Sequence, residues 1–208
     1  IAFNTMMTQV DKLMLSKMVS NVDLGYYALS YKIFDLVLVL PTFFMNVIFV
    51  LLATNFVNKR KYNVIYTKAY IYLGIVSILL TILFIIAAPV FIPAIWGGHM
   101  VGTAYSFNIL ILFTVFFYLS SPVSWVYVIE NKQHILILFY ALGFILNFGL
   151  NLILIPKFGY VGAAYVTGIT EIFILLLLEY YRIKHLKVKF LYRDSIIFLK
   201  ETANWFKF

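Results

Sequence analysis

Polar side chains recur at helical spacing inside two apolar stretches in the second half of the sequence. Asn147 and Asn151 are four residues apart and follow Gly143 at the same interval, and Thr167 and Glu171 repeat the spacing further along. Residues four apart lie on one face of an α-helix. Such a stripe either packs helices together through small, amide and hydroxyl groups or lines a polar cavity. Glu171, near the middle of its apolar stretch, is either a structural hydrogen-bonding group or a group that faces a cavity.

Basic residues form a second candidate group, nearer the N-terminus. Lys12 and Lys17 lie in the first apolar stretch, and Lys32 lies in the second. Lys32 has Asp35 one helical turn away and Lys12 has Asp11 beside it, so local ion pairs are one explanation. The other explanation is that the three lysines form a basic lining that attracts an anionic ligand.

Motifs for catalysis or metal binding are absent from the sequence. There is no Cys, no paired-carboxylate motif, no Gly-rich phosphate loop and no GxSxG or HExxH motif. His99 has no second His or carboxylate nearby in the sequence. We therefore expect no enzyme, no metal site and no cofactor, and we interpret the chain as working in transport, anchoring or assembly.

The elements that position these residues must be membrane helices. Hydrophobic residues make up 64% of the 208 residues, charged residues 12%, and the mean hydropathy is +0.99. Soluble domains carry about 25% charged residues, so this chain lacks the polar side chains to cover a water-facing surface. The 61 residues from 69 to 129 contain no Asp, Glu, Lys or Arg. One membrane helix needs roughly 20 apolar residues, so this stretch predicts two spans.

The apolar stretches predict an all-α, polytopic bundle of about six transmembrane helices. They are continuous and do not alternate with period two, which favours helices over barrel strands. Pro41 is expected to kink the second helix, and Pro89 and Pro93 to end the third. Pro156 is expected to end the fifth, and Gly159 and Gly162 to let the chain reverse. The predicted spans are residues 1–18 (the latter part of a truncated helix), 26–56, 69–91, 103–129, 134–155 and 161–181.

The distribution of Lys and Arg predicts the orientation. Residues 58–68, residues 130–134 and the segment after the last span together hold ten basic residues, whereas the alternate set holds four. The positive-inside bias places the first set in the cytoplasm. Residues 1–189 then form one membrane lobe, and residues 190–208 a cytoplasmic interfacial helix or tail. We attribute the net charge of +8 to this bias and to attraction for anionic lipid, not to nucleic-acid binding.

Two stretches resemble polysaccharide (Wzx-type) flippases of the multidrug/oligosaccharidyl-lipid/polysaccharide exporter superfamily. The first is VDKLML at residues 10–15, followed by DLGYYALSYK at residues 23–32. The second is NLILIPKFGYVGAA at residues 151–164, followed by Thr167 and Glu171. They occur in the order, and with the number of intervening spans, that the family has. The resemblance covers residues 1–189.

The resemblance implies the C-terminal lobe of a two-lobe transporter that works by alternating access. The implied cargo is a polyprenyl-diphosphate-linked oligosaccharide, flipped across the bacterial inner (cytoplasmic) membrane for O-antigen, capsule or exopolysaccharide. Basic groups would bind the diphosphate, and amide, hydroxyl or aromatic groups the sugars. Candidates for the first role are Lys12, Lys17 and Lys32, and for the second Tyr31, Asn147, Asn151 and Thr167, with Glu171 as a further cavity residue.

The implied partners are membrane lipids, the missing N-terminal lobe, and polysaccharide polymerase and chain-length proteins. One alternative is a drug/cation antiporter of the same superfamily, which would depend on acidic residues. Another is a lipid II flippase. A membrane glycosyltransferase or polymerase would need a large outer loop, and the outer connections here are short. A purely structural anchor would not need polar residues inside its spans.

Overall fold

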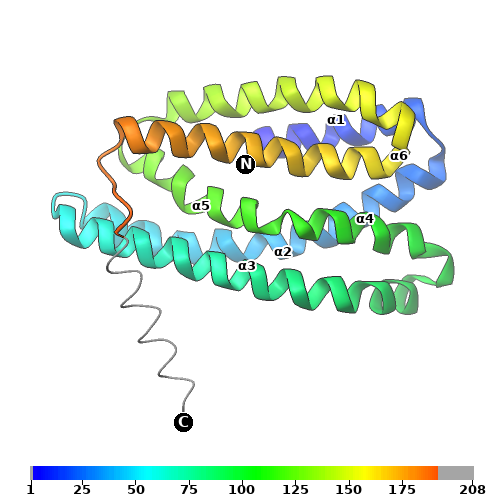
Figure 1. The fold of residues 1–208 in the computed structure, drawn as a ribbon, viewed down its shortest axis with the longest axis horizontal. Helices are drawn as coiled ribbons and strands as arrows, with labels where there is room; N and C mark the ends of the chain where they lie inside the picture. The colour runs from blue at the N-terminus through cyan, green and yellow to red at the C-terminus, as the bar shows by residue number, and fades with distance from the viewer. Residues whose placement is uncertain (1, 192–208) are drawn as a thin grey trace, which may run out of the picture.

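The computed structural model describes residues 2–191 and contains only helices in that range (Figure 1). This confirms the predicted all-α bundle. The predicted tail helix lies outside the described residues from residue 192 onward. The elements are α1 (Ala2–Met18), α2 (Asn21–Thr54), α3 (Lys59–Trp96), the short 3₁₀ helix η1 (Gly98–Met100), α4 (Val101–Leu112), α5 (Thr114–Ile129) and α6 (Gln133–His185).

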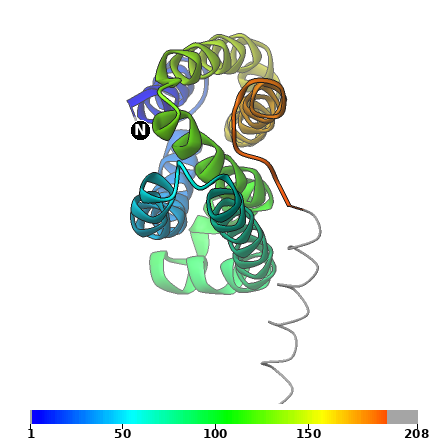
Figure 2. The same ribbon diagram turned by 90° about the vertical axis from the view of Figure 1, so that its left-hand side faces the viewer.

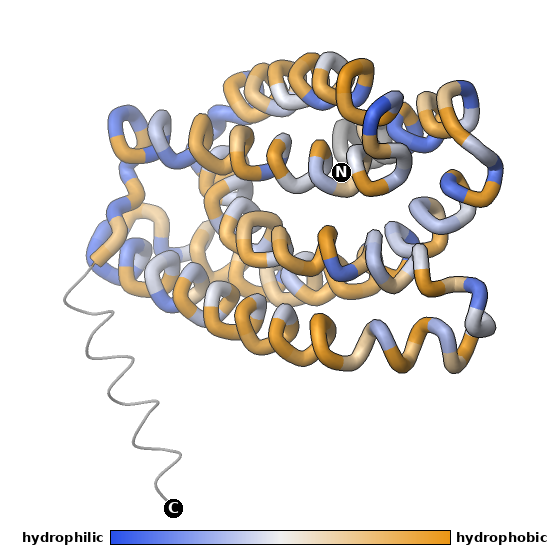
Figure 3. The backbone as a smooth tube through the Cα atoms, turned by 45° about the vertical axis from the view of Figure 1, so that its right-hand side comes forward, coloured by the Kyte–Doolittle hydropathy of each residue, from blue (hydrophilic) through white to orange (hydrophobic). Residues whose placement is uncertain are grey.

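Three of these helices, α2, α3 and α6, are long and apolar enough to cross a membrane. Two consecutive segments, η1–α4 (Gly98–Leu112) and α5, pass the same test when they are taken together as one span, which is bent by 45°. Because α6 folds back on itself at Gly159, it supplies two helical segments. Together with α1, these helices account for all six predicted segments. Figure 3 shows that hydrophobic residues dominate the long helices.

The prolines do not end the helices, contrary to the sequence-based prediction. α3 continues through Pro89 and Pro93 to Trp96 and ends at Gly97, whose φ is 99°. Pro41 is buried inside α2. A proline removes one backbone N–H, and membrane helices tolerate this because neighbouring groups compensate for the lost bond. A residue with positive φ is what ends this helix.

The reversal within α6 is made by Gly159 and not by Pro156. The helix runs past Pro156, and Gly159 then adopts φ 58° and ψ −138°, which only glycine adopts readily. Beyond it, a Cβ on Gly162 would lie 2.5 Å from the carbonyl oxygen of Leu154. The predicted close approach of the two halves of α6 is therefore confirmed, and the proline lies in the last turn before the reversal.

The predicted single span over residues 103–129 is two helices that meet at Phe113. No Pro or Gly lies at this break. The Phe113 ring instead occupies the space beside Gly168 of α6, where even a methyl group would not fit. The hydroxyl of Thr81 donates a hydrogen bond to the carbonyl of Ile111 at 3.1 Å, so this carbonyl beside the break has a partner. The break therefore results from packing against another helix.

The helices form two groups, which meet at α5 and also where α6 contacts α2 and α4 and where α1 contacts α2. α1 packs on α6, α2 and α3 pack on α4, and α5 contacts α2, α3 and α6. Viewed along the helices, α5 lies between the two groups (Figure 2). The connections predicted to share one side of the membrane do gather at a common end, which we call the Glu130 end.

At the Glu130 end, the backbone N–H groups of Lys187 and Val188 donate to the Glu130 carboxylate, at 2.8 and 3.1 Å. The next residue, Lys189, donates its N–H to Asn63 of α3. At the opposite end, the Tyr26 hydroxyl donates to the His99 carbonyl at 3.1 Å. Which end is cytoplasmic remains a prediction.

Candidate functional site

A buried carboxyl group, Asp11, is the centre of a polar network in the interior of the bundle. Its side chain lies on α1 and is 1% exposed. Its oxygens accept hydrogen bonds from the Tyr27 hydroxyl at 2.8 Å, the Asn151 amide at 2.6 Å and the Thr167 hydroxyl at 3.2 Å. The donors come from α2 and from both halves of α6, so Asp11 links α1 to three other helical segments.

The predicted stripe on α6 faces this carboxyl group. The Asn151 amide also donates to Asn147 at 3.1 Å, and the hydroxyls of Thr167 and Tyr27 lie 3.0 Å apart. The spacing of four places Asn147 and Asn151 on one face of the helix. Asn147, Asn151 and Thr167 therefore meet in one buried cluster.

Glu171 lies in the same interior and is 3% exposed. It accepts a hydrogen bond from Ser120 of α5. A cavity of about 20 Å³ between Asp11 and Glu171 has room for about one water molecule. The Thr170 hydroxyl lines this cavity and has no partner among the described residues. Tyr31 of α2 lines the cavity too.

The basic candidates lie outside this network. Lys12 is half-buried, with its Nζ 5.8 Å from the centre of the Tyr31 ring, and it lies within electrostatic range of Asp35. Lys17 and Lys32 are exposed. Within residues 2–191, the one ion pair closer than 4 Å joins Arg182 and Glu179. The structure thus does not form the Lys32–Asp35 ion pair that the sequence offered as one explanation.

Polar side chains also line the outside of α1 and α2. Their spacing of three, four or seven residues places them on one face of each helix. α1 and α2 are in contact, and Lys12 of α1 lies 5.8 Å from the centre of the Tyr31 ring of α2. We call this surface the polar face. It comprises Gln9, Lys12 and Ser16 of α1 and Lys32, Asp35, Thr42 and Asn46 of α2, all exposed except half-buried Lys12.

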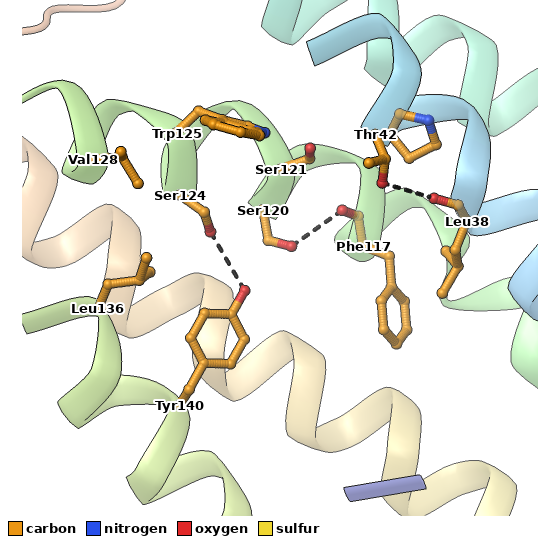
Figure 4. Close-up of a pocket in the computed structure, with 11 residues that line it drawn as sticks. Leu38, Thr42, Phe117, Ser120, Ser121, Ser124, Trp125, Val128, Leu136 and Tyr140 are labelled. Carbon is orange, nitrogen blue, oxygen red and sulfur yellow. Dashed lines mark hydrogen bonds between the residues drawn. The ribbon is translucent and has the colours of Figure 1, made fainter. Parts of the chain in front are cut away.

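A pocket of about 320 Å³ lies between α2, α5 and the first half of α6 (Figure 4). Thr42 of the polar face is one of its lining residues, so the pocket is continuous with that face. Ser124 and Tyr140 lie 3.4 Å apart across it (Figure 4). Ser120, on its wall, is the residue that binds Glu171. Ser120 therefore connects this pocket to the buried carboxyl group of Glu171.

Asp11 is the residue that sequence reasoning missed as a site candidate. It was interpreted only as a partner of Lys12, its neighbour in the sequence. A carboxylate inside an apolar stretch is itself a signal of function. Residues 2–191 contain no group of three or more His, Cys, Asp and Glu side chains placed to hold a metal ion. The network offers carboxyl, amide and hydroxyl groups, which bind cations or sugar hydroxyls.

Comparisons with known proteins identify the fold. No family model and no curated protein matches the sequence. Two solved structures match its fold. The first, an outward-facing multidrug resistance MATE family transporter of the MOP superfamily, has a TM-score of 0.84 and 19% identity over 93% of this chain and 45% of that chain. The second, a MATE protein in the straight conformation, has a TM-score of 0.83 and 20% identity over 92% and 44%.

The chain spans less than half the length of either matched structure. The first matched structure belongs to the superfamily that the sequence resemblance named, and neither matched structure is a Wzx-type flippase. The apolar helices and these neighbours identify a multi-pass membrane protein. Its described residues have the fold of one half of a MATE family transporter.

Proposed function

We propose that the chain forms one half of a membrane transporter whose passage runs along the polar face. The observation that carries this proposal is the exposure of Lys32 and Asp35 on α2, within about one turn of its uncharged apolar stretch, residues 36–54. A Lys or Asp at the centre of a membrane helix costs about 2.5–3.5 kcal/mol when it enters lipid. Such residues therefore face water or another part of the protein, and a passage between two halves supplies both.

We propose a lipid-linked oligosaccharide as the cargo. In this proposal, Lys12 and Lys32 of the polar face, with Lys17 further along α1, bind the diphosphate. Tyr31 contacts Lys12 and borders the inner cavity, so it joins the basic groups to the amide and hydroxyl groups that would bind sugars. The cell location in this proposal is the bacterial inner membrane, and polysaccharide polymerase and chain-length proteins are proposed partners.

A drug/cation antiporter is the second candidate, and the buried carboxyl groups favour it. Asp11 and Glu171 lie on either side of one small cavity, and both belong to the interior of the lobe. A cation or a proton bound there would neutralise a carboxylate that is costly to bury. In this candidate, the acidic interior and not the basic polar face carries the transport function.

One experiment separates the two candidates. The full-length protein is reconstituted into liposomes and assayed for two activities: flipping of lipid-linked oligosaccharides, lipid II included, and uptake of a cationic dye driven by an ion gradient. Flipping is expected, and Lys12→Gln with Lys32→Gln is expected to reduce it about tenfold or more, since each lysine supplies a charge-assisted contact worth roughly 1.5–3 kcal/mol.

Dye transport that Asp11→Asn abolishes, with no flipping of any lipid, would establish the antiporter instead. Lys157→Gln is the matched control, because Lys157 is exposed beside the reversal of α6 and away from the polar face. Absence of both activities from the wild-type protein would contradict the transport proposal itself.

A further inference from the structure

A hollow lies beside the connection between α2 and α3, at the Glu130 end of the bundle. Its volume is about 560 Å³. Two basic, two amide and two aliphatic side chains surround it, with no acidic one among them. They are Asn55, Asn58, Arg60, Lys61, Val64 and Ile65.

The basic side chains at this hollow have no ion-pair partner in the part of the chain that the structure describes. Lys59, Arg60 and Lys61 are consecutive and exposed, and none forms an ion pair within residues 2–191. They also lie in the first turn of α3, which contains no acidic residue. Cations at this end of a helix are repelled by the helix dipole. An anion in the hollow would reduce the repulsion among these cations and their repulsion by the helix dipole.

The same corner exposes apolar groups. Val64 and Ile65 line the hollow and are half-buried. Val57, in the connection itself, is 93% exposed, and Leu51 on the last turns of α2 is 46% exposed. An isolated cationic hollow for a small soluble anion would not need these groups. The lining instead matches a molecule with an anionic head and an apolar tail.

The place of the hollow in the membrane indicates which amphiphile it binds. It lies where the long apolar segments of α2 and α3 end, which is the level of the lipid headgroups. Lys187 also reaches this corner, with its Nζ 5.0 Å from the centre of the Phe56 ring. Basic residues at this level attract anionic phospholipids.

We propose that this hollow is a binding site for an anionic phospholipid of the surrounding membrane. The lipid phosphate contacts Arg60 and Lys61, and the amide NH₂ of Asn58, whose oxygen caps α3, binds the polar part of the headgroup. One acyl chain lies along Val64 and Ile65. The site does not depend on what the transporter carries, since none of its residues belongs to the polar face or to the Asp11 network.

The test measures lipid binding to the purified full-length protein in detergent by native mass spectrometry. Phosphatidylglycerol is expected to bind about tenfold more tightly than phosphatidylcholine, and Arg60→Ala with Lys61→Ala is expected to remove this preference. Lys132→Ala with Lys184→Ala is the control, because it removes the same charge from the same end and is expected to keep the preference.

Three results would overturn the proposal. The first is an unchanged preference in the Arg60→Ala, Lys61→Ala variant, and the second is an equal loss in the control, which would indicate only general attraction. The third is displacement of the lipid by inorganic phosphate, which would identify a free anion as the ligand. Val64→Asn keeps every charge and tests the acyl-chain contact, so it is expected to weaken phosphatidylglycerol binding as well.

Discussion

Replacing Gly168 with alanine tests the account of the bent span. Gly168 lies on the second half of α6, beneath the ring of Phe113 at the junction of α4 and α5. A Cβ at position 168 would lie 2.1 Å from Cδ2 and 2.2 Å from Cγ of that ring. Cγ is the first atom of the ring, so a small rotation of the side chain cannot relieve the overlap.

The expected cost follows from what holds the ring. Phe113 packs edge-on against Tyr165, with ring centres 6.4 Å apart, and it also contacts the Phe116 ring. Forcing an extra methyl group into such a site costs about 1–3 kcal/mol. For a protein of this size, that corresponds to a fall of roughly 2–10 °C in the apparent melting temperature.

Gly149→Ala is the matched control. Gly149 is also inside α6, but no atom lies within 4 Å of the position its Cβ would take. Alanine in a helix interior is more favourable than glycine by about 0.5–1 kcal/mol. The measurement is the loss of the monodisperse peak on size-exclusion chromatography after heating in detergent. If Gly168→Ala were as stable as Gly149→Ala, the steric explanation of the break would be wrong.

Three further predictions concern hydrogen bonds in the bundle, and the first two use the same melting assay. Asp11→Ala is expected to be less stable than Asp11→Asn. Alanine removes the acceptor that three buried donors share and leaves one N–H of the Asn151 amide without a partner, which costs about 1–3 kcal/mol. Equal stability would contradict the network. Ser120→Ala is expected to be less stable than Ser121→Ala, because only Ser120 binds the buried carboxyl group; the reverse order would refute this. Glu130→Ala is expected to raise the hydrogen-exchange rate of the Lys187 amide about tenfold, equivalent to about 1.4 kcal/mol of lost protection, and an unchanged rate would contradict its role as acceptor.

The helical bundle could be predicted because lipid leaves a chain few choices. A continuous apolar stretch must satisfy its backbone groups internally, so its length alone indicates a helix. It was equally predictable that Asn147 and Asn151 lie on the same face of their helix, because residues four apart share a face whatever that face contacts. The identity of that partner was not predictable, because Asp11 lies far away along the chain.

The features that sequence reasoning missed depend on contacts between distant segments. The break at Phe113 is caused by the ring that Gly168 accommodates, and no local residue marks it. The prolines of α3 are local signals that the surroundings override. Asp11 was missed because it adjoins Lys12, although consecutive helical residues point about 100° apart. One of the two therefore enters the core while the other borders the polar face.

The dependence of α1 on α6 has a consequence for how the protein is made. α1 carries Asp11, Lys12 and Lys17 within 17 residues, and the Asp11 carboxyl group is buried. Two of the three donors to Asp11 lie on α6, 140 and 156 residues further along the chain. During synthesis, the Asp11 carboxyl group therefore lacks its two α6 donors until that helix has been made. The buried network of this lobe is completed by a later helix and not in chain order.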